Sequence, residues 1–321
     1  MIHPGSVFAP GTALRGADDA LGRAPIGIVP IIWNNADLPD LAPPVPADHV
    51  LDEIARLGFE GTQTGTGYPS GAALVEALRA RDLRLAEVYA ALPFSANGPA
   101  GDALAVGRTK LAELHAADGD VLVAALGLSP GRIERAGRAE VSDTPRLTDD
   151  AWAALVEILD TLGREARAQG HRVAFHQHAG TFVETPDELD RLVDRTNADL
   201  VGICLDVGHY TVGGGDPVAA LRRYGERVTH VHLKDVAAGP LARLRAGELG
   251  GFLDALRARI FTELGGGLLD VPGVLAQLDR RDYAGWLMSE QDTTWNPSSE
   301  SAAASRRVLA YALRTLPGGQ R

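Results

Sequence analysis

Histidine and acidic side chains recur where apolar segments end in the second half of the chain. Six of the nine histidines lie between His171 and His232. Histidine, aspartate and glutamate are the ligands of divalent cations that keep positions open for water or substrate oxygens. The pattern therefore predicts a site for Zn²⁺, Mn²⁺, Co²⁺ or Mg²⁺. Its candidate residues are His176, His178, Asp206, His209, His232 and Glu290.

Each of these residues taken alone has a simpler explanation. A histidine in a strand is more often a core or surface residue than a ligand, and Asp206 could cap the turn that follows it. The argument for a metal lies in their occurrence at four successive strand ends. A buried carboxylate without a partner is costly, and a bound cation removes that cost.

Further polar residues near these strand ends are candidates for catalysis. His178 and His209 lie two or three residues beyond a candidate ligand, and either could be a general base near neutral pH. Lys234 is one of only two lysines in a chain with 29 arginines. A compact charge there suits binding or acidifying a substrate oxygen. For the neighbouring Asp235, a salt bridge on the barrel rim is the simpler interpretation and a substrate contact the alternative.

Four more side chains are candidates to line a substrate pocket, although a tryptophan on the rim or an arginine on a helix needs no function. They are Trp33, Glu87, Gln177 and Arg259.

Short apolar segments alternate with amphipathic segments from residue 26 to residue 313, which predicts eight strand–helix units. The first apolar segment is followed by Trp33-Asn34-Asn35 and not by a glycine-rich phosphate loop. Eight such units favour a closed (β/α)8 TIM barrel, whose active site lies at the carboxyl ends of the strands. The expected strands are Ile26–Ile32, Gly61–Thr64, Leu83–Ala90, Val121–Leu126, Arg172–His176, Leu200–Asp206, Val228–Leu233 and Gly285–Ser289.

Length and composition fit one barrel domain over residues 25–321, preceded by a Gly/Ala/Pro-rich N-terminal arm over residues 1–24. The net charge of −11 argues against nucleic acid as a partner and favours a small-molecule substrate. The single cysteine, Cys204, fits a reducing compartment and core packing. No targeting or membrane segment is evident, so we expect a cytoplasmic protein, with homo-oligomerisation left open.

Three motifs resemble the xylose-isomerase-like barrel superfamily of sugar isomerases, epimerases and endonuclease IV. They are CLDVGH, HVHLKD and GWLMSE. The resemblance implies that Asp206, His232 and Glu290 are metal ligands and that His209 lies beside the metal. Many members end the fifth strand with Glu, where this chain has His176, so the fourth ligand is either His176 or absent. Mn²⁺ and Co²⁺ are our first choices of cation, and Mg²⁺ and Zn²⁺ are the alternatives.

A narrower likeness, to the inosose (2-keto-myo-inositol) dehydratase group of inositol catabolism, extends over most of residues 26–315. It rests on IGIVPIIWNNADLPDL, GFEGTQTGTGYP, HQHAGTFVETPDELDRL and GWLMSEQD, with Gln63 at a place where the dehydratases look to have Glu. The likeness implies a lyase that acts on a small polyhydroxylated carbonyl compound. It would dehydrate a cyclic polyhydroxy ketone by abstracting an α-proton and expelling a β-hydroxyl.

Three other functions are alternatives. An isomerase or epimerase of a sugar or cyclitol would use the same enediolate and reprotonate it. A nuclease of the endonuclease IV type shares the barrel, but the acidic net charge argues against it. The chain could also be the barrel subunit of a two-component enzyme that eliminates a glycosyl group through a keto-sugar.

Overall fold

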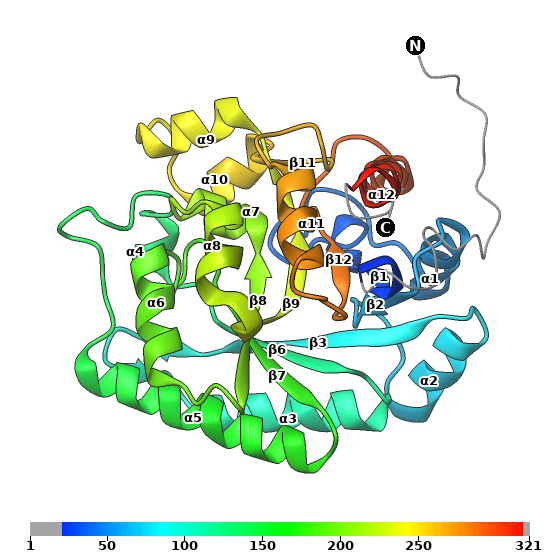
Figure 1. Cartoon of the computed structure of the whole chain (residues 1–321). Coiled ribbons are helices and arrows are strands. Elements are labelled where there is room, and N and C mark those ends of the chain that lie inside the picture. Colours follow the sequence, from blue (N-terminus) through cyan, green and yellow to red (C-terminus); the bar gives the residue numbers. More distant parts are fainter. Residues whose placement is uncertain (1–20, 317–321) are drawn as a thin grey trace.

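A closed barrel of eight parallel strands forms the centre of the protein (Figure 1). The computed structural model describes residues 21–316. Around the barrel the strand order is β1-β12-β9-β8-β7-β6-β3-β2. This architecture confirms the predicted (β/α)8 fold. The strands are β1 (Ile26–Ile28), β2 (Gly61–Gln63), β3 (Arg84–Leu92), β6 (Val121–Leu126), β7 (Arg172–His176), β8 (Val201–Asp206), β9 (Val228–Leu233) and β12 (Leu287–Ser289).

The strands match the apolar segments closely, and three of them differ from the expected bounds by two residues or more: β1 and β3 at their carboxyl ends, and β12, which begins at Leu287 and not at Gly285. The first segment was expected to be extended to Ile32, but β1 ends at Ile28 and Pro30–Ile32 forms a 3₁₀ turn. Pro30 has no backbone N–H for the ladder, and its fixed φ suits the first position of a helical turn. The third strand runs on to Leu92 because it pairs with β6 along the whole length of β6.

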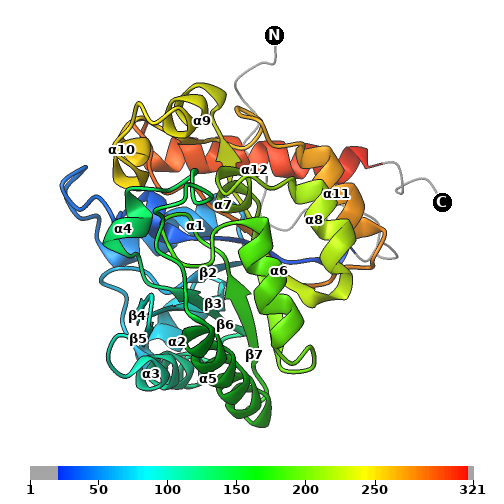
Figure 2. The ribbon, with the colours of Figure 1, turned by 90° about the vertical axis from the view of Figure 1, so that its left-hand side faces the viewer.

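Helices surround the barrel, and their start signals are those seen in the sequence. Thr185 caps α6 (Pro186–Arg195) in a complete capping box with Glu188, and Thr148 caps α5 (Asp149–Ala168). Figure 2 shows α3 (Ala103–Ala116), α5 and α6 lying outside the neighbouring strands. The other long helices are α1 (Ala47–Arg56), α2 (Gly71–Arg79), α8 (Pro217–Tyr224), α11 (Val271–Asp279) and α12 (Ser298–Thr315). Within residues 21–316, no helix is long and apolar enough to span a lipid bilayer.

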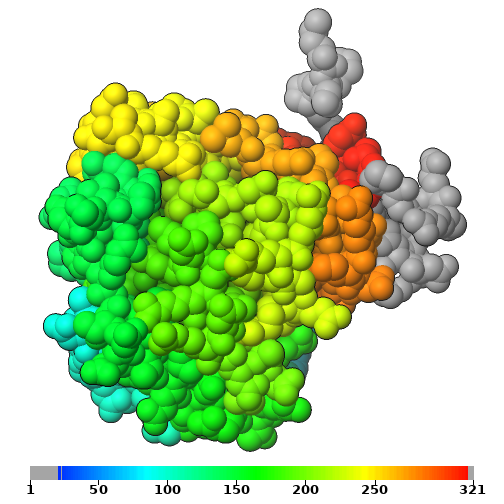
Figure 3. Space-filling model, turned by 60° about the vertical axis from the view of Figure 1, so that its left-hand side comes forward, coloured from blue at the N-terminus to red at the C-terminus, as the bar shows by residue number. Residues whose placement is uncertain are grey.

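Short elements that the sequence analysis did not predict gather at the carboxyl ends of the strands (Figure 1). They build a second apolar cluster that includes Ala179, Val212, Leu244 and Phe252. Figure 3 shows the yellow segment, which includes residues 238–257, against the green segment near residues 130–145. This layer covers one side of the barrel mouth. Its elements are α4 (Pro130–Ile133), α7 (Val207–Val212), α9 (Ala238–Arg245), α10 (Phe252–Arg257) and the β10–β11 pair (Asp235–Val236 and Phe261–Thr262). A second short hairpin, β4–β5 (Phe94–Ser95 and Gly98–Pro99), follows β3.

Large apolar side chains close the amino-terminal end of the barrel interior. A Cβ on Gly27 would lie 2.4 Å from Met288 Sδ, and one on Gly61 would lie 2.4 Å from the Trp286 ring. Glycine is therefore required where these two large side chains cross the barrel. The packed floor leaves the carboxyl end as the place for polar chemistry.

Most of the predicted N-terminal arm, residues 1–20, lies outside the described residues. Two residues near its end, Leu21 and Ala24, pack into the hydrophobic core, because Leu21 is fully buried and Ala24 nearly so. Leu21–Arg23 forms a 3₁₀ turn.

A buried ion pair ties α4 to the start of α6. The guanidinium of Arg132 donates to both carboxylate oxygens of Glu188 at 2.8 Å, and the Arg132 side chain is fully buried. The Arg132→Met substitution leaves a buried carboxylate without its partner, so we expect a loss of about 3–5 kcal/mol in the free energy of unfolding. Urea unfolding followed by circular dichroism measures it.

The matched control is Arg108→Met, which removes a similar ion pair with Glu165 from the solvent-exposed surface. Exposed pairs contribute about 0–1 kcal/mol to stability. The free energy of unfolding of this variant is therefore expected to stay close to that of the parent. Equal shifts for the two variants would contradict the role given to Arg132.

Candidate metal centre and active site

Four polar side chains from four adjacent strands meet at the carboxyl end of the barrel. His176 ends β7, Asp206 ends β8, His232 lies on β9, and Glu290 directly follows β12. One ligand atom from each lies within 4.8 Å of the others. His232 Nδ1 is 2.7 Å from Glu290 Oε2, and His176 Nε2 is 3.4 Å from Asp206 Oδ2. The structure thus brings together all four candidate ligands, including the uncertain fourth, His176.

Three of these side chains point buried polar atoms at one another without forming hydrogen bonds. Asp206 Oδ2, His232 Nδ1 and Glu290 Oε2 are all buried and have no hydrogen-bond partner among the described residues. Such groups cost about 1–3 kcal/mol each when nothing satisfies them. Their lone pairs are what a divalent cation binds. The residues present therefore fit a divalent metal ion, without indicating which one.

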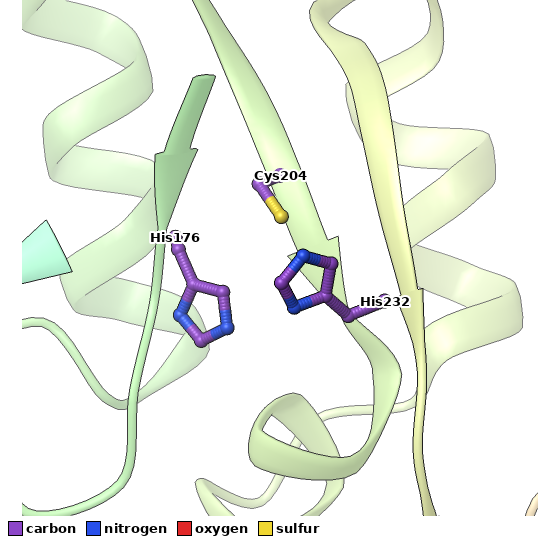
Figure 4. A group of neighbouring side chains, drawn as sticks. All are labelled: His176, Cys204 and His232. Carbon is purple, nitrogen blue, oxygen red and sulfur yellow. The ribbon is translucent and has the colours of Figure 1, made fainter. Parts of the chain in front are cut away.

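Cys204 offers a different grouping with the same two histidines (Figure 4). Its Sγ points between His176 on β7 and His232 on β9. Cys204 precedes Asp206 by two residues on β8, so both face the interior and the thiol lies deeper. Burial raises the pKa of the thiol to about 12, which keeps it protonated. Asp206 and Glu290 are therefore better ligands for a hard cation than Cys204.

Lys234 lies close to three carboxylates at the site. Its Nζ is 2.6 Å from Asp292 Oδ1 and 3.3 Å from both Asp206 Oδ2 and Glu290 Oε1. Burial alone would lower its pKa, but Asp206, Asp292 and Glu290 outweigh burial and hold the pKa well above its usual value. Lys234 is therefore a charged group that balances several acids, and it lies behind the wall of the cavity described below.

Asp292 is a site residue that the sequence analysis missed. It is almost fully buried, pairs with Lys234 and lines the cavity. Burial raises the pKa of Asp292 to about 7, with Lys234 opposing the shift. The signal was present in GWLMSEQD, where Asp292 follows Glu290 by two residues.

His178 and His209, the two candidate bases, stack with ring centroids 3.7 Å apart but differ in access. His178 lines the cavity, and its Nδ1 lies 2.7 Å from the main-chain oxygen of Ala179. His209 is fully buried, with Nε2 2.8 Å from Lys234 Nζ. Burial, together with neighbouring positive charge, lowers the pKa of each imidazole well below its usual value. Of the two histidines, only His178 can therefore contact a molecule in the cavity.

A cavity of about 390 Å³ opens beside the four candidate ligands. None of the described residues that line it is lysine or arginine, and many of its side chains are polar. Tyr89 and Asp37, which the sequence analysis did not single out, lie on this wall. The polar side chains of the wall include Asn34, Asp37, Gln63, Tyr89, His176, His178, Glu290 and Asp292.

Two predicted pocket residues lie beside the cluster and do not line the cavity. Gln177 is fully buried, and its Nε2 donates to the main-chain oxygen of Asp206 at 2.7 Å. Glu87 is fully buried on β3, where it contacts His232 Nε2 at 2.9 Å. Both contact the candidate ligands and are separated from the cavity by them.

Three other predicted pocket residues lie outside the cavity and have structural partners. Trp33 is buried in the core, where its Nε1 donates to Ser299 Oγ at 3.2 Å. Arg259 is exposed, with its guanidinium 4.8 Å from the Trp295 ring centroid.

Asp235 is the third of them and is fully buried. Its carboxylate forms no salt bridge within residues 21–316 and instead accepts four backbone N–H groups. The donors are Val236, Gly265, Gly267 and Leu269. Asp235 thereby holds the segment after β11 against β10.

The amino-acid sequence of this chain matches a known protein family. Residues 51–312 match the family model described as xylose isomerase-like TIM barrel. An inosose dehydratase of Clostridium beijerinckii is 31% identical over 298 residues, which cover 89% of this chain and 96% of the relative. The rhizopine catabolism protein MocC of Rhizobium meliloti is 37% identical over 270 residues, covering 83% of this chain and 81% of the relative.

Solved structures share the fold. The crystal structure of the IOLI protein with a bound zinc atom has a TM-score of 0.64 and 16% sequence identity, and it covers 90% of this chain and 98% of its own. At this identity the likeness supports the fold alone. Together with the family match over most of the barrel, it leads to one conclusion: this chain belongs to the xylose isomerase-like TIM barrel family and is related over most of its length to inosose dehydratases.

Proposed function

We propose that this chain is a divalent-metal-dependent lyase that dehydrates a cyclic polyhydroxy ketone, with 2-keto-myo-inositol as the first substrate to test. The observation that carries the proposal is the set of buried atoms on Asp206, His232 and Glu290 that form no hydrogen bond among the described residues, beside a cavity lined mainly by uncharged and acidic side chains and two histidines. The relatives named inosose dehydratase support the reaction and the substrate class. The zinc-bound IOLI neighbour supports a metal.

His176, Asp206, His232 and Glu290 would hold the cation, and we propose Mn²⁺ or Co²⁺ ahead of Mg²⁺ and Zn²⁺. When bound, the cation would polarise the substrate carbonyl and stabilise the negative charge that develops on its oxygen.

His178 is assigned the role of general base. The oxygen of Ala179 can only accept a hydrogen bond, so His178 Nδ1 carries a hydrogen and donates it. The lone pair of the neutral ring is then on Nε2, and His178 lines the cavity. We assign to this nitrogen the removal of the proton from the carbon next to the carbonyl. His209, the alternative, is buried against Lys234.

We assign to Asp292 and Lys234 the task of assisting loss of the β-hydroxyl from the substrate. Asp292 lines the cavity, and its Oδ1 is paired with Lys234 Nζ at 2.6 Å. The C–H bond breaks towards His178, its electron pair forms the new carbon–carbon double bond, and the β-hydroxyl leaves with a proton from Asp292 as water. Lys234 then stabilises the Asp292 carboxylate that remains.

A proton NMR time course in D₂O with 2-keto-myo-inositol tests the proposal. We expect loss of water from the substrate when Mn²⁺ or Co²⁺ is present, and no reaction after treatment with EDTA until the metal is restored. Exchange of the α-proton without loss of water would show that the enzyme is an epimerase and not a dehydratase. No conversion and no exchange by folded, metal-supplied protein would overturn the assignment of this substrate.

A further inference from the structure

A buried pair of side chains, Glu87 and His230, lies directly behind the candidate ligand His232. Glu87 Oε2 is within hydrogen-bond distance of His232 Nε2, at 2.9 Å, and also contacts His230 Nε2. Glu87 and His230 are completely buried, and neither lines the cavity. The pair therefore touches the candidate metal centre only through His232.

Both members of the pair follow a local irregularity in their strands. In the β2–β3 ladder, Thr62 pairs with Leu85 but Gln63 pairs with Glu87, so one residue of β3 is extra. In the β8–β9 ladder, Ile203 pairs with Val228 but Cys204 pairs with His230, so one residue of β9 is extra. Such a bulge interrupts the alternation of side chains and changes where the next one points.

The two strands lie on opposite sides of the barrel. In the order β1-β12-β9-β8-β7-β6-β3-β2, three strands separate β3 from β9 in either direction. Glu87 therefore reaches across the interior to meet both histidines of β9. The two register shifts are in different ladders, yet they place one carboxylate and one histidine at the same point. This indicates that the contact between Glu87 and His230 is a specific feature of the fold.

The contact determines which nitrogen of His232 can bind a cation. A carboxylate can only accept, so His230 and His232 each donate from Nε2. The neutral His232 ring then has its lone pair on Nδ1, the atom that lies 2.7 Å from Glu290 Oε2 and 3.8 Å from Asp206 Oδ2. Metal-binding histidines are commonly oriented in this way by a carboxylate on their other nitrogen.

We propose that Glu87, supported by His230, is a positioning residue that fixes the tautomer and ring orientation of His232 and thereby sets the affinity of the metal centre. The inference rests on the proposed metal site. It gives Glu87 a role different from the substrate contact predicted from the sequence.

Isothermal titration of the full chain with Mn²⁺ alone tests the inference. The key variant is Glu87→Leu, which fills the same space without an acceptor, and we expect affinity to fall about 10- to 100-fold. Glu87→Gln keeps an acceptor oxygen and is expected to retain affinity within about tenfold of the parent. Thr62→Val is the control, because Thr62 is also fully buried and its hydroxyl donates to the main-chain oxygens of Ile28 and Gln63, away from the candidate ligands.

The outcomes separate this inference from the proposed function. If the parent binds Mn²⁺ and folded Glu87→Leu binds equally well, the role of Glu87 is wrong while the metal centre stands. A loss in Thr62→Val as large as that in Glu87→Leu, or in Glu87→Gln as large as in Glu87→Leu, would also overturn it. If the parent itself binds no metal, the metal centre fails and this inference fails with it.

Discussion

Replacing Asp206 with asparagine is expected to abolish tight metal binding and to lower kcat/KM by about 10³-fold or more. The metal contributes several kcal/mol to the stabilisation of charge, and each ~1.4 kcal/mol is a tenfold change in rate. The substitution is nearly isosteric. Asp206 Oδ1 caps α7 by accepting from the backbone N–H of His209 at 2.8 Å, and the asparagine side-chain oxygen can keep this bond. The fold should therefore survive.

Metal content, measured by elemental analysis after gel filtration, and the rate of substrate loss together check this prediction. Asp216→Asn is the matched control, since Asp216 caps α8 in the same manner but is exposed to solvent. This control is expected to keep both metal and activity. If folded Asp206→Asn retains the metal and most of its activity, the cation is bound elsewhere.

Replacing His178 with glutamine is expected to lower kcat by about 10²- to 10⁴-fold, the range attributed to general acid–base catalysis. Metal affinity should change little, because His178 is not among the grouped ligand atoms. The variant should also lose exchange of the α-proton with solvent deuterium, which NMR measures separately from the loss of water.

His171→Gln is a suitable comparison for this variant. His171 precedes β7 at the opposite end of the barrel, where it interacts with His115 and the main-chain oxygen of Gly119. Its replacement is expected to leave kcat unchanged. Deuterium exchange at the parental rate in His178→Gln would show that another group removes the proton.

The fold followed from the sequence because its signals are local. Eight apolar segments separated by amphipathic ones identify a barrel, and residues such as Thr148 and Thr185 mark helix starts within one turn. The short elements over the barrel mouth carry no such signal. α7 and α10 are each six residues long, and they are held by tertiary packing around Phe252.

The metal-ligand set was also accessible from the sequence, for a geometric reason. Carboxyl ends of adjacent parallel strands must converge, so residues ending β7, β8, β9 and β12 were bound to be neighbours. The cavity wall is different, because Asp37 and Tyr89 reach it through loop geometry and strand direction that depend on the whole fold. The place of Glu87 depends on a bulge, which shifts the alternation of β3 and leaves no trace in its apolar pattern.

The structure places all five residues predicted as substrate contacts outside the lining of the cavity. Trp33, Asp235 and Arg259 lie near barrel-end segments, but position along the chain does not reveal what a side chain bonds to. Asp235 illustrates the point, since backbone N–H groups from a segment some thirty residues later satisfy its carboxylate. Those donors could not be identified before the path of that segment was known.

Anomalous diffraction from crystals of the chain grown with Zn²⁺ or Mn²⁺ addresses the metal centre itself. The geometry predicts one strong peak bound by His176 Nε2, Asp206 Oδ2, His232 Nδ1 and Glu290 Oε2, with zinc–ligand distances of about 2.0–2.2 Å. A peak bound by Cys204, or one away from these four side chains with the site between them closed by protein contacts, would contradict the proposed centre.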